Sequence, residues 1–158
     1  MTSTNPVEQL AIAKAMREWL WLYPSVEIVH IVGFSILVGS IVMFDLRVLG
    51  LSKRISVRAL SRHLLPWSLG ALVLIVPTGL LMFSAHASDF LGNRAFQVKM
   101  ALLLTAGLNA AFFHTGPYQS VKSWDVDAAA PAIAKVSVAL SIVLWLGVIS
   151  CGRLLAYL

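Results

Sequence analysis

Charged residues and cysteine are both scarce in this sequence. Only 12% of its 158 residues are charged and 59% are hydrophobic, whereas soluble domains carry about 25% charged residues. The single cysteine, Cys151, excludes an intrachain disulfide. There is no CxxC or CxxCH motif and no glycine-rich phosphate loop, which argues against an attached c-type haem and a P-loop nucleotide site. These absences favour a membrane protein with little mass outside the bilayer.

Four long apolar runs predict membrane-spanning helices at residues 24–51, 57–85, 94–114 and 131–157. Each run meets the length of about 20 residues that a spanning helix needs. Because the connections are short, neighbouring helices should be antiparallel. The predicted fold is therefore all-α, a transmembrane up-down four-helix bundle that occupies residues 24–158.

Residues 1–23 differ from the four runs in their pattern. Apolar residues recur at helical spacing over residues 6–22, charged residues gather to one side, and Trp19, Trp21 and Tyr23 cluster at the end. This pattern is typical of an amphipathic helix that lies on the membrane surface and ends in an aromatic belt. We expect this segment to be a separate interfacial helix.

The positive charges favour one orientation in the membrane. We call the end of the bundle at Pro24 side A and the end at Lys53 side B. Side B carries Arg47, Lys53, Arg54, Arg58, Arg62, Lys122 and Lys135, whereas side A carries Lys14, Arg17, Arg94, Lys99 and Arg153. By the positive-inside rule side B is cytoplasmic. The net charge of +5 thus reflects topology, not nucleic-acid binding, and both termini should be periplasmic in a bacterial inner membrane.

The topology sorts the four histidines into two pairs on different helices. His30 and His86 lie toward side A, and His63 and His114 lie toward side B. His63 and His86 share a helix but are about 34 Å apart at 1.5 Å per residue, so they cannot hold one ligand. Two imidazoles from facing helices are what bis-histidine ligation of a haem iron requires. The four histidines are therefore predicted metal ligands for one or two haem b groups.

Small residues near the histidines suggest space for a flat ring. Gly70, Gly79 and Gly107 each lie seven residues, nearly two helical turns, from a histidine on their own helix. Gly33 follows His30 by three residues, and Ala110 precedes His114 by four. The alternative is close helix packing, for which membrane helices commonly use glycine.

Several polar residues near the helix ends are candidates for secondary roles. Glu27 precedes His30 by three residues and either orients its imidazole or faces interfacial water. The haem propionates could pair with basic residues, for which the candidates are Arg47, Arg62, Arg94 and Lys99. Asn109 lies mid-membrane, so it should form a hydrogen bond with another helix.

Copper is the alternative metal. Soft thioether and thiolate ligands select copper(I). The candidate ligands are Met82, four residues before His86, together with Met43, Met100 and Cys151. Methionine also fills hydrophobic cores without any metal, and the sequence has no His-Met repeat or MxxxM motif.

Three strings carry a resemblance to known proteins: "VEIVHIVGFSILVGSIVMFDLRVLGL", "LSRHLLPWSLGALVLIVPTGLLMFS" and "KMALLLTAGLNAAFFH". Over about residues 24–115 the chain resembles a family of uncharacterised bacterial four-helix membrane proteins. More distantly, it is similar to the copper-resistance protein D family and to small b-type cytochromes. The first resemblance implies no activity, the second implies copper and the third implies haem.

The expected function is a b-type cytochrome that passes electrons across the membrane, between quinol and a periplasmic redox partner. We expect it to be an electron-transfer subunit in a homo- or hetero-oligomer, not an enzyme on its own. The alternatives are a copper-binding or copper-transporting membrane protein and a non-metal structural subunit of a membrane complex.

Overall fold

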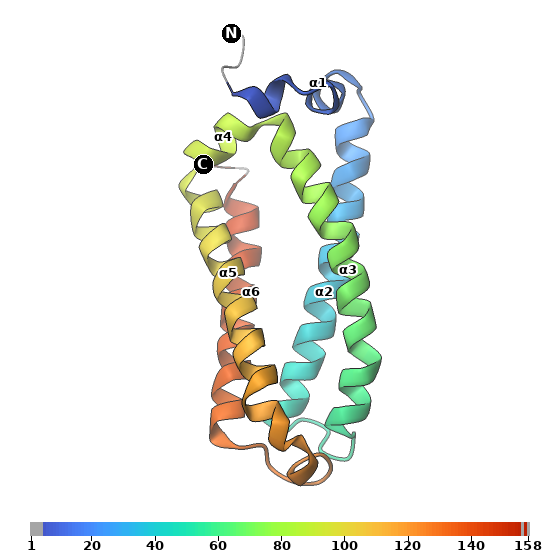
Figure 1. The fold of residues 1–158 in the computed structure, drawn as a ribbon, viewed down its shortest axis with the longest axis vertical. Helices are drawn as coiled ribbons and strands as arrows, with labels where there is room; N and C mark the ends of the chain where they lie inside the picture. The colour runs from blue at the N-terminus through green and yellow to red at the C-terminus, as the bar shows by residue number, and fades with distance from the viewer. Residues whose placement is uncertain (1–4, 156, 158) are drawn as a thin grey trace.

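A computed structural model describes residues 5–155 and 157. Its four long helices are α2 (Leu22–Leu49), α3 (Val57–Ala85), α5 (Arg94–Thr115) and α6 (Ala132–Leu154). They run alternately up and down (Figure 1), and each is long and apolar enough to cross a membrane. No strand occurs within the described residues. The predicted all-α four-helix bundle is confirmed, and the chain is a multi-pass membrane protein.

Shorter helices join the long ones. They are η1 (Pro6–Gln9), α1 (Ala11–Glu18), α4 (Ala87–Gly92) and η2 (Pro117–Ser123). The predicted bounds of the long helices hold to within three residues, and α6 ends at Leu154, before the predicted end at residue 157. Residues 1–4, 156 and 158 lie outside the described part of the chain.

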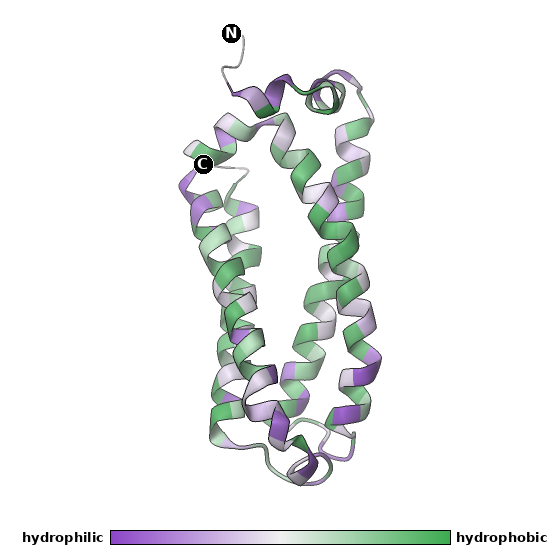
Figure 2. Ribbon diagram, viewed as in Figure 1, coloured by the Kyte–Doolittle hydropathy of each residue, from purple (hydrophilic) through white to green (hydrophobic). Residues whose placement is uncertain are grey.

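The bundle consists of two helix pairs. α2 packs along α3, α5 packs along α6, and α2 also contacts α6, whereas α3 and α5 are not among the closely packed pairs. Figure 1 shows the two pairs side by side, and residues of all four long helices, among them Leu37, Ala71, Ala106 and Trp145, pack in one core cluster between them. The long helices are largely hydrophobic (Figure 2), and many of their large apolar side chains are exposed, as contact with lipid requires.

The N-terminal helix α1 docks on the side A end of the bundle. Its Ala13 and Met16 are buried. Arg17 donates from Nη1 to the Ala85 carbonyl (2.9 Å) and from Nη2 to the Glu8 carbonyl (2.7 Å). The Glu8 carboxylate accepts from the Ser88 amide at 2.6 Å. The predicted amphipathic helix thus forms, but it is anchored to α3 and α4 by specific contacts.

At side B, Arg47 holds the ends of two loops together. The side chain is only 4% exposed. Its guanidinium donates to the carbonyls of Ile55 (2.5 Å), Lys53 (2.8 Å) and Asp125 (2.9 Å). The loop from α2 to α3 and the loop before α6 are therefore joined through one cation.

The Asp125 side chain adds a second link between these loops. Its Oδ1 accepts from Ser56 Oγ (2.9 Å) and from the Arg58 amide (2.9 Å), both at the start of α3. Burial alone would raise the pKa of this carboxyl, but these hydrogen bonds and the Arg58 charge outweigh burial and lower the pKa below its usual value. The carboxylate therefore stabilises the start of α3 when ionised.

Candidate functional site

A cavity of about 510 Å³ lies between the two helix pairs, in the half of the bundle nearer side B. All four long helices contribute to its wall. On α3 the lining residues recur every three to four positions, so they form one face of the helix; they are Ser61, Leu64, Leu65, Ser68, Leu69 and Leu72. The volume is within the range of about 300–1,000 Å³ of small-molecule sites.

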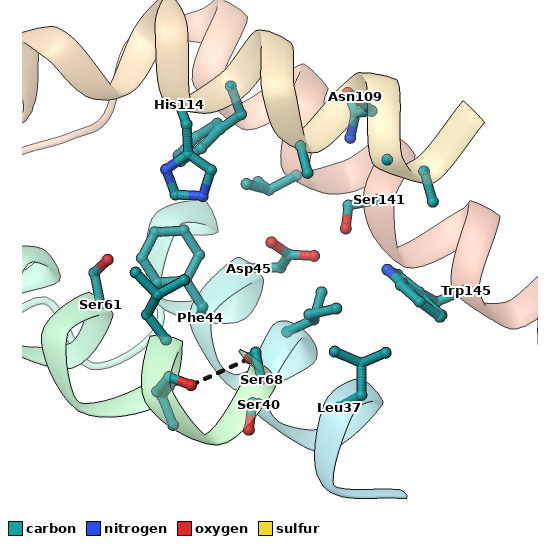
Figure 3. A pocket seen from close by; sticks show the side chains of 18 of the residues that line it. Leu37, Ser40, Phe44, Asp45, Ser61, Ser68, Asn109, His114, Ser141 and Trp145 are labelled. Carbon is teal, nitrogen blue, oxygen red and sulfur yellow. Dashed lines mark hydrogen bonds between the residues drawn. The ribbon is translucent and has the colours of Figure 1, made fainter. Parts of the chain in front are cut away.

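Two titratable side chains face this cavity from opposite walls (Figure 3). Asp45 on α2 is 4% exposed, and its Oδ2 has no hydrogen-bond partner among the described residues. Ser141 on α6 lies near the same carboxyl (Figure 3). The His114 ring on α5 lies edge-on to the rings of Phe113 and Tyr118, with centroid distances of 5.5 Å and 5.3 Å. The described wall is thus mostly apolar, with Asp45 and His114 as titratable groups beside several serine hydroxyls and one amide.

The remaining amide in the wall is already paired. Asn109 donates from Nδ2 to the Ser137 carbonyl, and Ser137 Oγ donates to Asn109 Oδ1, both at 2.9 Å. The predicted interhelical hydrogen bond of Asn109 is confirmed. These two bonds to Ser137 join α5 to α6, and they leave Asp45 and His114 as the titratable groups of the described wall.

His63 lies on the other side of α3. It follows the lining residue Ser61 by two positions, which is a rotation of about 200° around the helix axis. His63 is exposed and is not part of the cavity wall. The structure therefore does not bring His63 and His114 together around a common space.

His30 occupies a socket formed by the Pro77-Thr78-Gly79 segment of α3. Its Nδ1 lies 2.9 Å from Thr78 Oγ1, and that hydroxyl lies 2.6 Å from the Leu74 carbonyl. Because a carbonyl only accepts, Thr78 donates its one proton to Leu74 and accepts from His30. The Nδ1–H tautomer is thereby favoured.

His86 is not level with His30. It lies eight residues beyond Thr78, about 12 Å along the helix axis. There its ring meets Tyr23 edge-on at 5.8 Å and its Nδ1 is 3.7 Å from the Asp89 carboxylate. These two histidines also do not face each other across a shared site. Glu27 is exposed. The residue that hydrogen-bonds to His30 and orients its imidazole is Thr78.

The four predicted spacer glycines have four different surroundings. A Cβ on Gly33 would lie 3.1 Å from Ile75 Cγ1, and one on Gly79 would lie 3.2 Å from His30 Cε1. Gly33 thus serves close packing of α2 on α3, and Gly79 makes room for an imidazole. Gly70 and Gly107 both have open space beside them. Only Gly107 borders the cavity.

None of the predicted propionate partners lines the cavity. Arg47 donates instead to the loop carbonyls of Lys53, Ile55 and Asp125. Arg62 and Arg94 are exposed. Lys99 lies near α6, with Nζ 3.8 Å from the Cβ position of Gly152.

The copper candidates are likewise dispersed. Met43 is 60% and Met100 is 40% exposed, whereas Cys151 is buried. Within residues 5–155 and 157, no group of three or more His, Cys, Asp or Glu side chains is arranged to hold a metal ion. The haem and copper assignments remain predictions.

Asp45 is the functional candidate that the sequence patterns did not single out. Its signal was present, because an ionisable residue inside a membrane helix is a functional candidate by default. Its neighbour Arg47 marks the end of the apolar run, and this proximity made Asp45 resemble an interfacial residue. The cavity shows that its side chain points into the bundle (Figure 3).

The fold and the cavity together define a class: a four-helix integral membrane protein with a small-molecule-sized cavity between its helices. Residues 21–158 match DUF6644, a family of unknown function. The chain belongs to this family, which supports the resemblance to uncharacterised membrane proteins and does not extend to copper-resistance proteins or cytochromes. No curated protein and no solved structure matches the chain.

The socket makes a testable prediction for the His30 tautomer. In ¹⁵N spectra of histidine-labelled protein at alkaline pH, His30 should carry its proton on Nδ1. Thr78→Val removes the acceptor and should lower the Nδ1–H to Nε2–H ratio by about fivefold, the equivalent of one net hydrogen bond of about 1 kcal/mol. Thr105→Val, which removes a hydroxyl bonded only within α5, should leave the ratio unchanged. A predominant Nε2–H form in the unmodified protein would contradict the assignment.

Proposed function

We propose that this protein binds a ring-containing lipophilic molecule of the quinone type, taken from the bilayer into the cavity between its helix pairs. The observation that carries this proposal is the Asp45 carboxyl, which is 4% exposed and has an unpartnered oxygen on the cavity wall. An unpaired polar atom buried in an apolar site costs free energy unless something meets it. A ligand with a polar group on its ring would do so.

The rest of the wall suits a ring. Phe44, Phe113 and Trp145 supply aromatic surface and His114 supplies a second polar group. Aromatic pairs favour offset or edge-on contacts that add to simple area burial. Because α3 and α5 are not closely packed, they offer the route by which a molecule dissolved in lipid would enter.

The proposal is tested by tryptophan fluorescence of the protein in lipid nanodiscs, titrated with a short-chain ubiquinone analogue. Trp145 borders the cavity, so a bound quinone should quench it in a saturable manner. Gly107→Phe should fill the cavity and weaken binding by about tenfold or more. Gly70→Phe is the matched control, since Gly70 also has open space beside it but lies outside the cavity wall. Absence of saturable quenching, or equal affinities for both variants, would refute the proposal.

A b-type cytochrome that transfers electrons is the second candidate, and one specific observation favours it. Gly107 and Ala110 line the cavity together with His114, so the small-residue face predicted beside this histidine does border open space. His114 would be the axial ligand there, and the opposite wall offers no second histidine. Reduced and oxidised absorption spectra after haem-sufficient expression decide it: a Soret band that His114→Ala removes and His63→Ala retains supports this candidate, and no Soret band rejects it.

A further inference from the structure

Among the residues that the structure describes, Asp45 is the one acidic side chain in the cavity wall, and no lysine or arginine lines the wall. The wall of α3 contributes only hydroxyls as polar groups, Ser61 and Ser68, and that of α6 contributes Ser137 and Ser141. On α5, Asn109 is paired with Ser137. Arg47 is near in sequence, but its guanidinium is bonded to loop carbonyls.

Within the described part of the chain, His114 is therefore the only other titratable side chain that lines the cavity. A carboxyl group can hydrogen-bond in two opposite senses. The ionised form only accepts, whereas the protonated form also donates through its O–H. A quinol offers hydroxyl donors, and the corresponding quinone offers carbonyl acceptors only. Protonated Asp45 is thus the form that can hydrogen-bond a quinone, because a carboxylate has no proton to donate to a carbonyl. Ionised Asp45 favours a quinol, because it accepts a charge-assisted hydrogen bond from the hydroxyl.

We propose that Asp45 makes ligand binding proton-linked, so that the carboxylate selects the quinol and the carboxylic acid selects the quinone. This inference rests on the proposed function and assigns the regulation of the same site. The step involves hydrogen bonds only: no electron moves, and the proton on Asp45 exchanges with water when the ligand changes. Oxidation of the ligand would need an electron acceptor and is not part of the proposal.

The sign of the linkage follows from the form that binds. The quinone binds protonated Asp45, so its affinity is full at low pH and is lost as pH rises through the titration. The quinol binds ionised Asp45 more tightly, so its affinity rises over the same interval. For one linked proton, each affinity changes by up to about tenfold per pH unit within that interval.

The test measures the affinities of a short-chain ubiquinone and of its quinol from about pH 5.5 to about pH 8.5. This range lies above the ordinary carboxyl pKa of about 4 and includes the ordinary histidine pKa of about 6.5. The quinol series is kept anaerobic. In the unmodified protein the ratio of quinone to quinol affinity should fall by about tenfold or more across the range. Asp45→Asn, which keeps the shape and has both a donor and an acceptor, should make the ratio independent of pH.

His114→Gln is the control for the second titratable group, and it should retain the pH dependence. Thermal unfolding of each variant confirms that the bundle is intact. A flat ratio in the unmodified protein, or a dependence that survives Asp45→Asn and disappears with His114→Gln, would overturn the assignment to Asp45. Saturable binding that Gly107→Phe abolishes but pH does not affect would overturn only the proton linkage, whereas no binding of either form would refute the proposed function itself.

Discussion

Gly33→Leu should force α2 away from α3 and lower the free energy of unfolding by about 3 kcal/mol, the upper part of the range for overpacking a tight site. Even the first side-chain atom, a Cβ at this position, would lie 3.1 Å from Ile75 Cγ1, 3.2 Å from Leu74 Cβ and 3.4 Å from the Ala71 carbonyl oxygen. The Ala71 carbonyl belongs to a helix backbone and cannot move independently. Small residues at such contacts allow membrane helices to approach closely, so the large side chain should separate the helices.

Gly39→Leu is the matched control for this prediction. Gly39 lies on the same helix, and a Cβ there would meet nothing within 4 Å. Its substitution should change stability by less than about 0.5 kcal/mol, as exposed positions usually do. Unfolding of both variants in mixed detergent micelles, followed by circular dichroism against increasing SDS, gives the comparison. Equal losses for the two glycines would show that α2 and α3 are not in contact at Gly33.

Arg47→Ala should destabilise the side B end by about 3 kcal/mol, because it removes a buried cation that serves three carbonyls. The lost bonds are those to Ile55, Lys53 and Asp125. Hydrogen bonds to charged groups contribute about 1.5–3 kcal/mol each, and acceptors left buried without a partner add a penalty. Arg47→Lys should recover only part of the loss, since an ammonium group cannot reproduce the planar fork of a guanidinium.

Arg62→Ala provides the comparison for Arg47→Ala. Arg62 is exposed and bonds to no described residue, so its loss should cost less than about 0.5 kcal/mol. Limited proteolysis of the side B loops, together with the SDS unfolding midpoint, measures both effects. If Arg47→Ala were as stable and as resistant to protease as Arg62→Ala, the role of Arg47 as a link between the loops would be wrong.

The role of Arg47 illustrates why cations near helix ends are difficult to interpret from sequence. The positive-inside rule and a cofactor partner both predict a basic residue at that place. The structure shows a third use, in which the cation satisfies the carbonyls of a turn. The local sequence contains no signal for it, because one of the carbonyls belongs to Asp125, 78 residues away.

The sequence by itself determined the number of long helices, their bounds to within three residues and their antiparallel order. Apolar run length and terminal residues such as Ser56 and Asn93, which cap α3 and α5, are local properties and need no knowledge of the neighbours. The half of the bundle in which each histidine lies followed from topology alone. Helical spacing alone predicted that the small residue Gly107 lies on the same helix face as His114.

Only the tertiary structure decided which face of each helix points inward and how the helices align in height. Because lipid is as apolar as a protein core, the spanning segments carry little polarity difference between faces to specify their rotation. His63 therefore turned out to face away from the cavity, and His30 lies level with Thr78, not with His86. Because this rotation is not specified by the sequence, Asp45 could be identified as a candidate site residue only from the cavity that the four long helices enclose.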